Sequence, residues 1–280
     1  MKPGEVTCII QARMGSHRLP GKTLALVSGK PLIQHVIERV SASTLVNHLI
    51  LATSTSSQDD PVAELTQKLG IASFRGSEND VLDRYYQASQ LSDTEHLVRI
   101  NGDCPLMDPE VIDRVIRKYI SAEFDYVANI LNYPDGLGVE AFSRHALKRA
   151  WAEATLGSDR EHVTPYIRNS GHFRVSEVRH NVDLSHLKWS VDSQADLEFV
   201  RAVNEHLGTE GSEKLFAMGD VIQALEDFPS LALINQVSYR GEGLYHSIAN
   251  DPPIVATNLN LSRSKALKGR GLNLIPRLTQ

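Results

Sequence analysis

Short apolar runs alternate with helical periodicity through the first 120 residues, and this alternation constrains the fold more than any other feature. Four runs have the length of buried strands, at residues 6–12, 48–53, 71–74 and 96–100. An amphipathic helical pattern follows each run, at residues 31–40, 60–69, 81–86 and 108–116. Such alternation predicts an α/β fold with a mainly parallel sheet and helices on both faces. Ligands of such sheets bind at the carboxyl ends of the strands.

The alternation becomes irregular after residue 125. Further strands are expected at 126–129, 138–143, 173–178 and 189–192. Further helices are expected at 146–154, 162–169 and 194–207. This second half predicts a mixed sheet. We therefore expect one α/β domain over residues 1–230, followed by a C-terminal extension or arm over residues 231–280 that is basic and without clear periodicity.

Charge and cysteine content exclude several classes of protein. The net charge of -5 argues against general binding to nucleic acid, which needs a basic surface. With only 2 cysteines, neither a disulfide framework nor a cysteine-rich zinc site is indicated. No apolar run reaches the length of a membrane span, and the first residues lack the pattern of a signal peptide. We expect a cytoplasmic protein.

The loop after the first strand, residues 11–22, has the composition of a phosphate-binding loop. It carries three cations and two glycines, namely Arg13, Arg18, Lys22, Gly15 and Gly21. Glycine lets backbone N–H groups approach a polyphosphate, while Arg and Lys neutralise its charge. Five residues separate Gly15 from Gly21, one too many for a Walker A loop. The loop predicts a nucleoside triphosphate as ligand; the alternative is a solvated surface loop.

Two aspartates follow apolar runs at the expected ligand-binding edge. Asp103 comes after the fourth strand, and Asp192 comes just before the helix expected at 194–207. Mg²⁺ is commonly held by one or two carboxylates together with substrate phosphates, so the pair predicts a magnesium site. Each aspartate also has a simpler interpretation, since Gly102-Asp103 is an ordinary turn pair and Asp192 could cap the helix.

Several segments together resemble the cytidylyltransferase family, most closely the branch named for spore coat polysaccharide biosynthesis protein F. The similar segments are residues 10–13, 18–22, 74–77, 80–85, 101–105, 160–166 and 191–192. The resemblance implies a Rossmann-like nucleotide-diphospho-sugar transferase fold, related to the synthetases of CMP-Kdo and CMP-sialic acid. It also implies Mg²⁺ as cofactor and a homodimer.

The same resemblance implies roles for individual residues. The positions of Arg13 and Lys22 contact the triphosphate, and those of Asp103 and Asp192 hold magnesium; these four are the expected catalytic residues. The full nucleotide-binding set is Gln11, Ala12, Arg13, Gly15, Arg18, Lys22, Arg75, Gly76, Asn79 and Asn101. Within it, Arg75, Gly76 and Asn79 correspond to the segment near the nucleobase.

Two further residues fall where the resemblance places the acceptor. Glu140 and His162 are the expected acceptor-binding residues. For Glu140 the alternative is a carboxylate that ties down a loop, and for His162 it is a side chain that caps or packs a helix.

The resulting hypothesis is a nucleotidyltransferase that moves CMP from CTP to a sugar or sugar-acid acceptor and releases pyrophosphate, in surface or spore polysaccharide biosynthesis. An acceptor hydroxyl would attack the α-phosphorus in line with the departing pyrophosphate, without a covalent enzyme intermediate. Two alternatives stay open. One is a metal-dependent glycosyltransferase that uses a nucleotide sugar, and the other is a non-catalytic nucleotide-binding scaffold.

Overall fold

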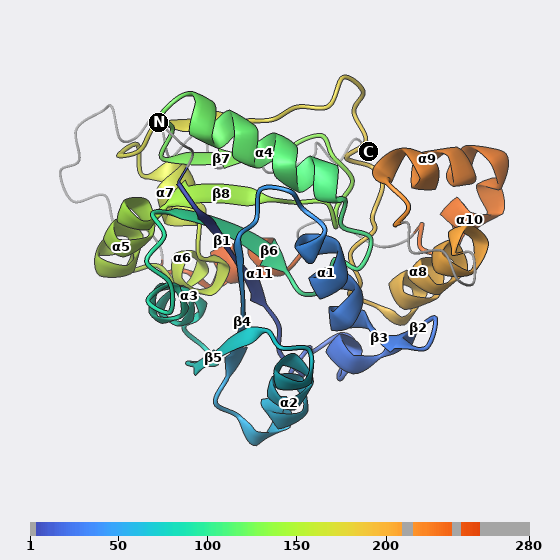
Figure 1. Cartoon of the computed structure of the whole chain (residues 1–280), viewed down its shortest axis with the longest axis horizontal. Coiled ribbons are helices and arrows are strands. Elements are labelled where there is room, and N and C mark those ends of the chain that lie inside the picture. Colours follow the sequence, from blue (N-terminus) through green and yellow to red (C-terminus); the bar gives the residue numbers. More distant parts are fainter. Residues whose placement is uncertain (1–3, 209–214, 237–241, 253–280) are drawn as a thin grey trace.

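A seven-stranded sheet forms the centre of the molecule in the computed structural model, which describes residues 4–208, 215–236 and 242–252. The strands are β1 (Val6–Gln11), β4 (His48–Ser54), β5 (Ala72–Gly76), β6 (His96–Asn101), β7 (Tyr126–Ala128), β8 (Glu140–Ser143) and β9 (Val175–Glu177). Their order is β5-β4-β1-β6-β8-β7-β9 (Figure 1). Only β8 runs antiparallel to its neighbours, so the prediction of a mixed, mainly parallel sheet is confirmed.

Helices cover both faces of this sheet, also as predicted. The longer ones are α1 (Leu32–Ser41), α2 (Asp60–Lys68), α3 (Val81–Ser89), α4 (Pro109–Ser121), α5 (Arg144–Glu153) and α8 (Gln194–Leu207). One buried apolar cluster joins α1, α4 and α8 to the sheet, and a second cluster joins α3 and α5 to its other face. Side chains of β1 belong to both clusters in alternation, as expected for a central parallel strand.

The remaining elements are short. They are the 3-10 turns η1 (Lys22–Leu24) and η2 (Ser57–Asp59), the ribbon β2 (Leu26–Val27) and β3 (Lys30–Pro31), and the helices α6 (Gly157–His162), α7 (Pro165–Asn169), α9 (Met218–Asp227), α10 (Pro229–Leu233) and α11 (Glu242–Asn250). Helices α9 and α10 gather with α8 at one end of the molecule (Figure 1). Within the described residues, no helix has the length and apolar character needed to cross a membrane.

The strand expected at residues 189–192 is wrong. The backbone N–H groups of Trp189 and Ser190 donate to the carbonyl of Asp135, and that of Val191 donates to the carbonyl of Asp103. Trp189 and Val191 are buried, which accounts for the apolar pattern. The segment is therefore a buried loop that hydrogen-bonds to other loops at the end of the sheet, and it is not a strand of the sheet.

Two other expectations change. The helix expected at 162–169 is interrupted, because His162 ends α6 and Val163 takes a positive φ of 69° before α7 begins. The extension expected over residues 231–280, which shows no clear periodicity in the sequence, includes the end of α10 and the whole of α11, and α11 packs against α6. The basic part of the extension, residues 253–280, lies outside the described residues.

Candidate active site

The sheet brings the phosphate loop and Asp103 to the same edge, because β1 and β6 are parallel neighbours in register. At their ends, the N–H of Gly102 donates a 2.8 Å hydrogen bond to the carbonyl of Gln11. A Cβ on Gly102 would lie 2.6 Å from that same oxygen. Only glycine permits this approach, which places Asp103 beside the start of the loop.

Lys22 lies at the centre of the site. Its ammonium is 2.8 Å from Asp103 Oδ2 and 3.1 Å from Asp192 Oδ1, and it donates a 2.6 Å hydrogen bond to the carbonyl of Val191. Burial lowers the pKa of Lys22, but the charges of Asp103 and Asp192 outweigh it, so the pKa is raised. Three of the four expected catalytic residues, Lys22, Asp103 and Asp192, therefore converge, and Lys22 carries its charge there at neutral pH.

Asp192 is surrounded by cations. Besides Lys22, its Oδ1 is 2.8 Å from Arg18, and its Oδ2 is 2.9 Å from Lys188. Burial raises the pKa of Asp192, yet Lys22 and then Lys188 hold it below its ordinary value. The carboxylate therefore stays ionised in this cluster.

Lys188 and Asp196 were missed by reasoning from the sequence. Their side chains are 6% and 0% exposed, and they form a 3.0 Å ion pair. The sequence does contain an indication of this pair. Lys188, Asp192 and Asp196 follow one another at intervals of four residues, in a segment that also carries the apolar residues Trp189 and Val191. Charged side chains are rarely buried without partners, so this spacing pointed to a buried cluster.

The Asp103 and Asp192 carboxylates suit a divalent cation that also binds substrate phosphates. Among the described residues, no group of three or more His, Cys, Asp or Glu side chains could hold a metal ion by itself. Two carboxylates that already share one positive group, the Lys22 ammonium, are the donor set that Mg²⁺ takes when phosphates complete its coordination.

The phosphate loop is fixed at both ends by buried groups. The N–H of Met14 donates a 2.6 Å hydrogen bond to Asp59, and Thr23 Oγ1 donates a 2.7 Å bond to the carbonyl of Arg13. Gly21 has a φ of 78°, the left-handed conformation that glycine adopts without strain. Protein groups thus hold the backbone of the loop near both of its ends.

Arg13 does not join Lys22 at the aspartates. Its guanidinium lies 3.7 Å from Glu78, at a pocket of about 520 Å³. The pocket is lined by Arg13, Met14, Gly15, Ser16, His17, Pro20, Gln58, Glu78 and Asn79. The structure therefore brings three predicted nucleotide-binding residues together here, namely Arg13, Gly15 and Asn79.

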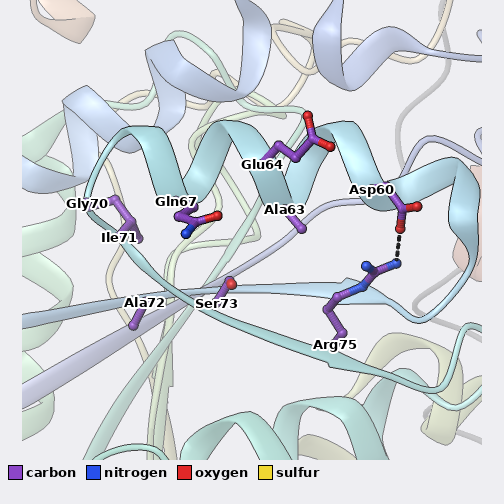
Figure 2. A pocket seen from close by; sticks show the side chains of 9 residues that line it. All are labelled: Asp60, Ala63, Glu64, Gln67, Gly70, Ile71, Ala72, Ser73 and Arg75. Carbon is purple, nitrogen blue, oxygen red and sulfur yellow. Dashed lines mark ion pairs between the residues drawn. The ribbon is translucent and has the colours of Figure 1, made fainter.

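Arg75 lies elsewhere. Its guanidinium donates to the carbonyls of Ser54 and Ser56 and forms a 2.7 Å ion pair with Asp60. Figure 2 shows Arg75 reaching from β5 toward Asp60 of α2, in a pocket of about 750 Å³. The predicted base-contacting residues Arg75 and Asn79 thus line different pockets.

Three other predicted nucleotide-binding residues lie at or near the strand ends. Ala12 is buried, and its N–H donates to the carbonyl of Ala52. Gln11 Oε1 accepts from Arg99, while Asn101 Oδ1 is buried with no hydrogen-bond partner in the described part of the chain. Asn101 Oδ1 is therefore a hydrogen-bond acceptor beside Gln11, where the loop of residues 11–22 begins.

Gly76 ends β5, a strand that β4 separates from β1. A Cβ there would lie 2.7 Å from the ring of Phe74. Packing against Phe74 is therefore sufficient to explain why residue 76 is a glycine, without any contact with a nucleobase.

Glu140 is fully engaged by the protein. Arg99 pairs with its Oε2, while Tyr126 and Thr164 each donate a 2.5 Å hydrogen bond to its Oε1. Burial raises the pKa of Glu140, but Arg99 outweighs it and the pKa is lowered. The carboxylate ties together β6, β7, β8 and the start of α7, as in the alternative considered from the sequence.

His162 lies between α6 and the extension. Its Nε2 is 3.0 Å from Ser247 Oγ of α11, and Ser247 in turn donates to Glu161. Burial first, and then the charge of Arg99, lower the pKa of His162. The ring is therefore neutral at pH 7 and is held by a helix contact.

Comparisons with known proteins agree with this architecture. The chain is 33% identical to spore coat polysaccharide biosynthesis protein SpsF of Bacillus subtilis, over 73% of this chain and 88% of that one. The structure of a cytidylyltransferase from Leptospira borgpetersenii superposes with a TM-score of 0.77 at 28% identity, covering 84% of this chain and 99% of that one.

A more distant similarity concerns the fold alone. CMP:2-keto-3-deoxy-manno-octonic acid synthetase complexed with CTP gives a TM-score of 0.57 at 22% identity, covering 72% of this chain and 99% of that one.

The family model described as "Cytidylyltransferase" matches residues 7–238. This match covers most of the chain, and the chain therefore belongs to the cytidylyltransferase family of enzymes.

Proposed function

We propose that this enzyme transfers CMP from CTP to a hydroxyl of a sugar or sugar acid and releases pyrophosphate. The new bond joins the acceptor oxygen to the α-phosphorus, and the bond from that phosphorus to the pyrophosphate oxygen breaks. Membership of the family supports nucleotidyl transfer from CTP. Similarity to SpsF supports a role in polysaccharide biosynthesis and, with it, a sugar-type acceptor.

One observation carries the proposal: the Lys22 ammonium lies between the Asp103 and Asp192 carboxylates, at the end of a basic loop. A triphosphate in this place would meet Lys22 and Arg18, whose charges stabilise the negative charge that develops on the phosphates. Asp103 and Asp192 would hold the magnesium ion. When bound, the ion would neutralise phosphate oxygens and orient the pyrophosphate for departure.

The remaining residues receive supporting roles in this proposal. Arg13, Gly15 and Asn79 share a pocket that would take another part of the nucleotide, and the orphaned Oδ1 of Asn101 would accept a hydrogen bond from it. Glu140 has an indirect role in this proposal, because Arg99, Tyr126 and Thr164 already occupy its oxygens. It holds β6, β7, β8 and the start of α7 together.

The direct test is pyrophosphate release from CTP and Mg²⁺ with a panel of sugar acids. We expect release with at least one acceptor, and Asp103→Asn should lower it by on the order of 100-fold or more. Asp93→Asn, at an exposed position away from the loop, is the matched control. Absence of pyrophosphate with every acceptor would count against the proposal.

The two alternatives give different products. A glycosyltransferase would release a nucleoside phosphate from a nucleotide sugar and no pyrophosphate from CTP. A binding scaffold would take up CTP in calorimetry regardless of Mg²⁺ and turn over none of the substrates.

A further inference from the structure

We infer that Lys188 is a positioning residue for Asp192, fixing that carboxylate so that one oxygen faces the metal and the phosphates. This inference rests on the proposed function, since it concerns the same site. The Lys188 side chain is only 6% exposed, and its ammonium lies 2.9 Å from Asp192 Oδ2 and 3.0 Å from Asp196 Oδ2. Lys188 thus contacts Asp192 from the protein interior.

The two oxygens of Asp192 have different surroundings. Oδ1 meets the cations of the phosphate loop, at 3.1 Å from Lys22 and 2.8 Å from Arg18. Oδ2 lies 2.9 Å from the ammonium of Lys188, a side chain that is only 6% exposed. Tilting of the carboxylate plane would break the buried contact with Lys188, so one oxygen is kept toward the loop and the other toward Lys188. Groups that hold a metal ligand in this way commonly change metal affinity when they are removed.

Asp196 holds Lys188 in turn. Its side chain is 0% exposed, and its Oδ2 accepts from the backbone N–H groups of Asp192 and Ser193 at 3.1 and 2.9 Å. Lys188 is therefore pinned by a carboxylate that is itself bonded to the backbone of Asp192. The ion pair and the turn that carries Asp192 form one unit.

The extension completes this unit. Asn235, just after α10 and 8% exposed, donates a 2.8 Å hydrogen bond to the carbonyl of Lys188 and a 3.1 Å bond to Asp196 Oδ1. Asn235 of the extension thus contacts Lys188 and Asp196, the two residues that hold the candidate metal ligand Asp192. On this inference, the start of the extension is part of the catalytic unit.

The test uses Mn²⁺ in place of Mg²⁺, because electron paramagnetic resonance distinguishes free from bound Mn²⁺. Binding is titrated in the presence of CTP for the full-length wild type and for Lys188→Met, Lys188→Gln and Lys188→Arg. We expect the Met and Gln variants to bind Mn²⁺ about 10- to 100-fold more weakly, and the Arg variant to recover part of the loss. Affinity for CTP in EDTA should stay within about twofold, since the loop contacts remain.

Lys118→Met is the matched control. Lys118 lies on α4, is also partly buried, and donates a hydrogen bond to the carbonyl of Glu177. Because it makes no contact with Asp103 or Asp192 among the described hydrogen bonds, removal of its ammonium should leave Mn²⁺ binding unchanged. Lys188→Gln keeps a donor in case the Met variant does not fold, and thermal unfolding reports whether each variant is folded. Folded Lys188 variants that bind Mn²⁺ as tightly as the wild type would overturn the role of Lys188 and leave the proposed function standing. A wild type that binds CTP but no Mn²⁺ would overturn the proposed function itself.

Discussion

The N–H of Val191 donates a 2.8 Å hydrogen bond to the carbonyl of Asp103. This bond joins the loop after β6 to the turn before α8, two segments far apart in the sequence. The carbonyl of Val191 accepts from the Lys22 ammonium at 2.6 Å, so the phosphate loop is tied to the same point. The carboxylates of Asp103 and Asp192 consequently have positions set by one shared backbone junction.

Gly102→Ala should disturb this junction. The new Cβ would lie 2.6 Å from the carbonyl of Gln11 and 2.9 Å from the Cβ of Ala12, both on the neighbouring strand end. The strand ends must separate, which should lower the free energy of unfolding by about 1–3 kcal/mol and move Asp103. Urea unfolding and the pyrophosphate assay check both effects. Gly219→Ala is the control, since nothing lies within 4 Å of its added Cβ; equal behaviour of the two variants would contradict the expectation.

Lys22→Met should lower the rate of pyrophosphate release by on the order of 100-fold or more, because a charge aimed at the phosphates is lost. Lys22→Arg should recover little, since the planar guanidinium cannot occupy the point between Asp103 and Asp192 in the same way. Steady-state kinetics with CTP measures the change. Lys30→Met, which removes an exposed lysine paired with Glu38, should have no such effect.

Glu140→Gln should destabilise the fold. The substitution leaves the Arg99 guanidinium buried without its opposite charge, a loss of about 3–5 kcal/mol for a broken buried pair. Chemical denaturation measures the free energy of unfolding. Glu110→Gln, which removes the nearer of the two carboxylate partners of exposed Arg117, should cost less than about 1 kcal/mol. Similar losses in the two variants would show that the buried pair contributes little.

The same carboxylate predicts a pH dependence of stability. Burial raises the pKa of Glu140 but Arg99 outweighs it, so the folded pKa lies below the ordinary value of 4.5. A lowered pKa gives stability that is complete above 4.5 and is lost as the pH falls through the folded value. Denaturation at a series of acidic pH values should show this decline, with a shallower slope in Glu140→Gln. Parallel curves would exclude Glu140 as a contributor.

Asp251→Ala should loosen the contact between the extension and α6. Asp251 accepts hydrogen bonds from the Ser158 N–H at 2.9 Å and from Ser158 Oγ at 2.5 Å, in the first turn of α6. Loss of a capping carboxylate costs about 1 kcal/mol. Hydrogen exchange should become faster for the amides of α6. Asp227→Ala, at an exposed position at the end of α9, should leave those amides unchanged. Unchanged exchange in Asp251→Ala would show that the contact is not stabilising.

The sequence by itself determined the α/β class and most of its elements. Apolar runs such as residues 6–12 and helical patterns such as 31–40 depend on local periodicity, which a single chain displays directly. It also pointed to Arg13, Lys22, Asp103 and Asp192 as catalytic candidates, through the basic loop after the first strand, the aspartate after the fourth, and the resemblance of these segments to a known family.

Only the tertiary structure decided which of these groups meet. It paired Arg13 with Glu78 rather than with the aspartates, and it gave the segment 189–192 loop partners in place of a strand. It also revealed Lys188, buried behind Asp192 and supported from the extension by Asn235. Periodicity reports burial and local conformation, whereas ion pairs between distant segments depend on how the chain packs in three dimensions, and that information is not contained in any local window of the sequence.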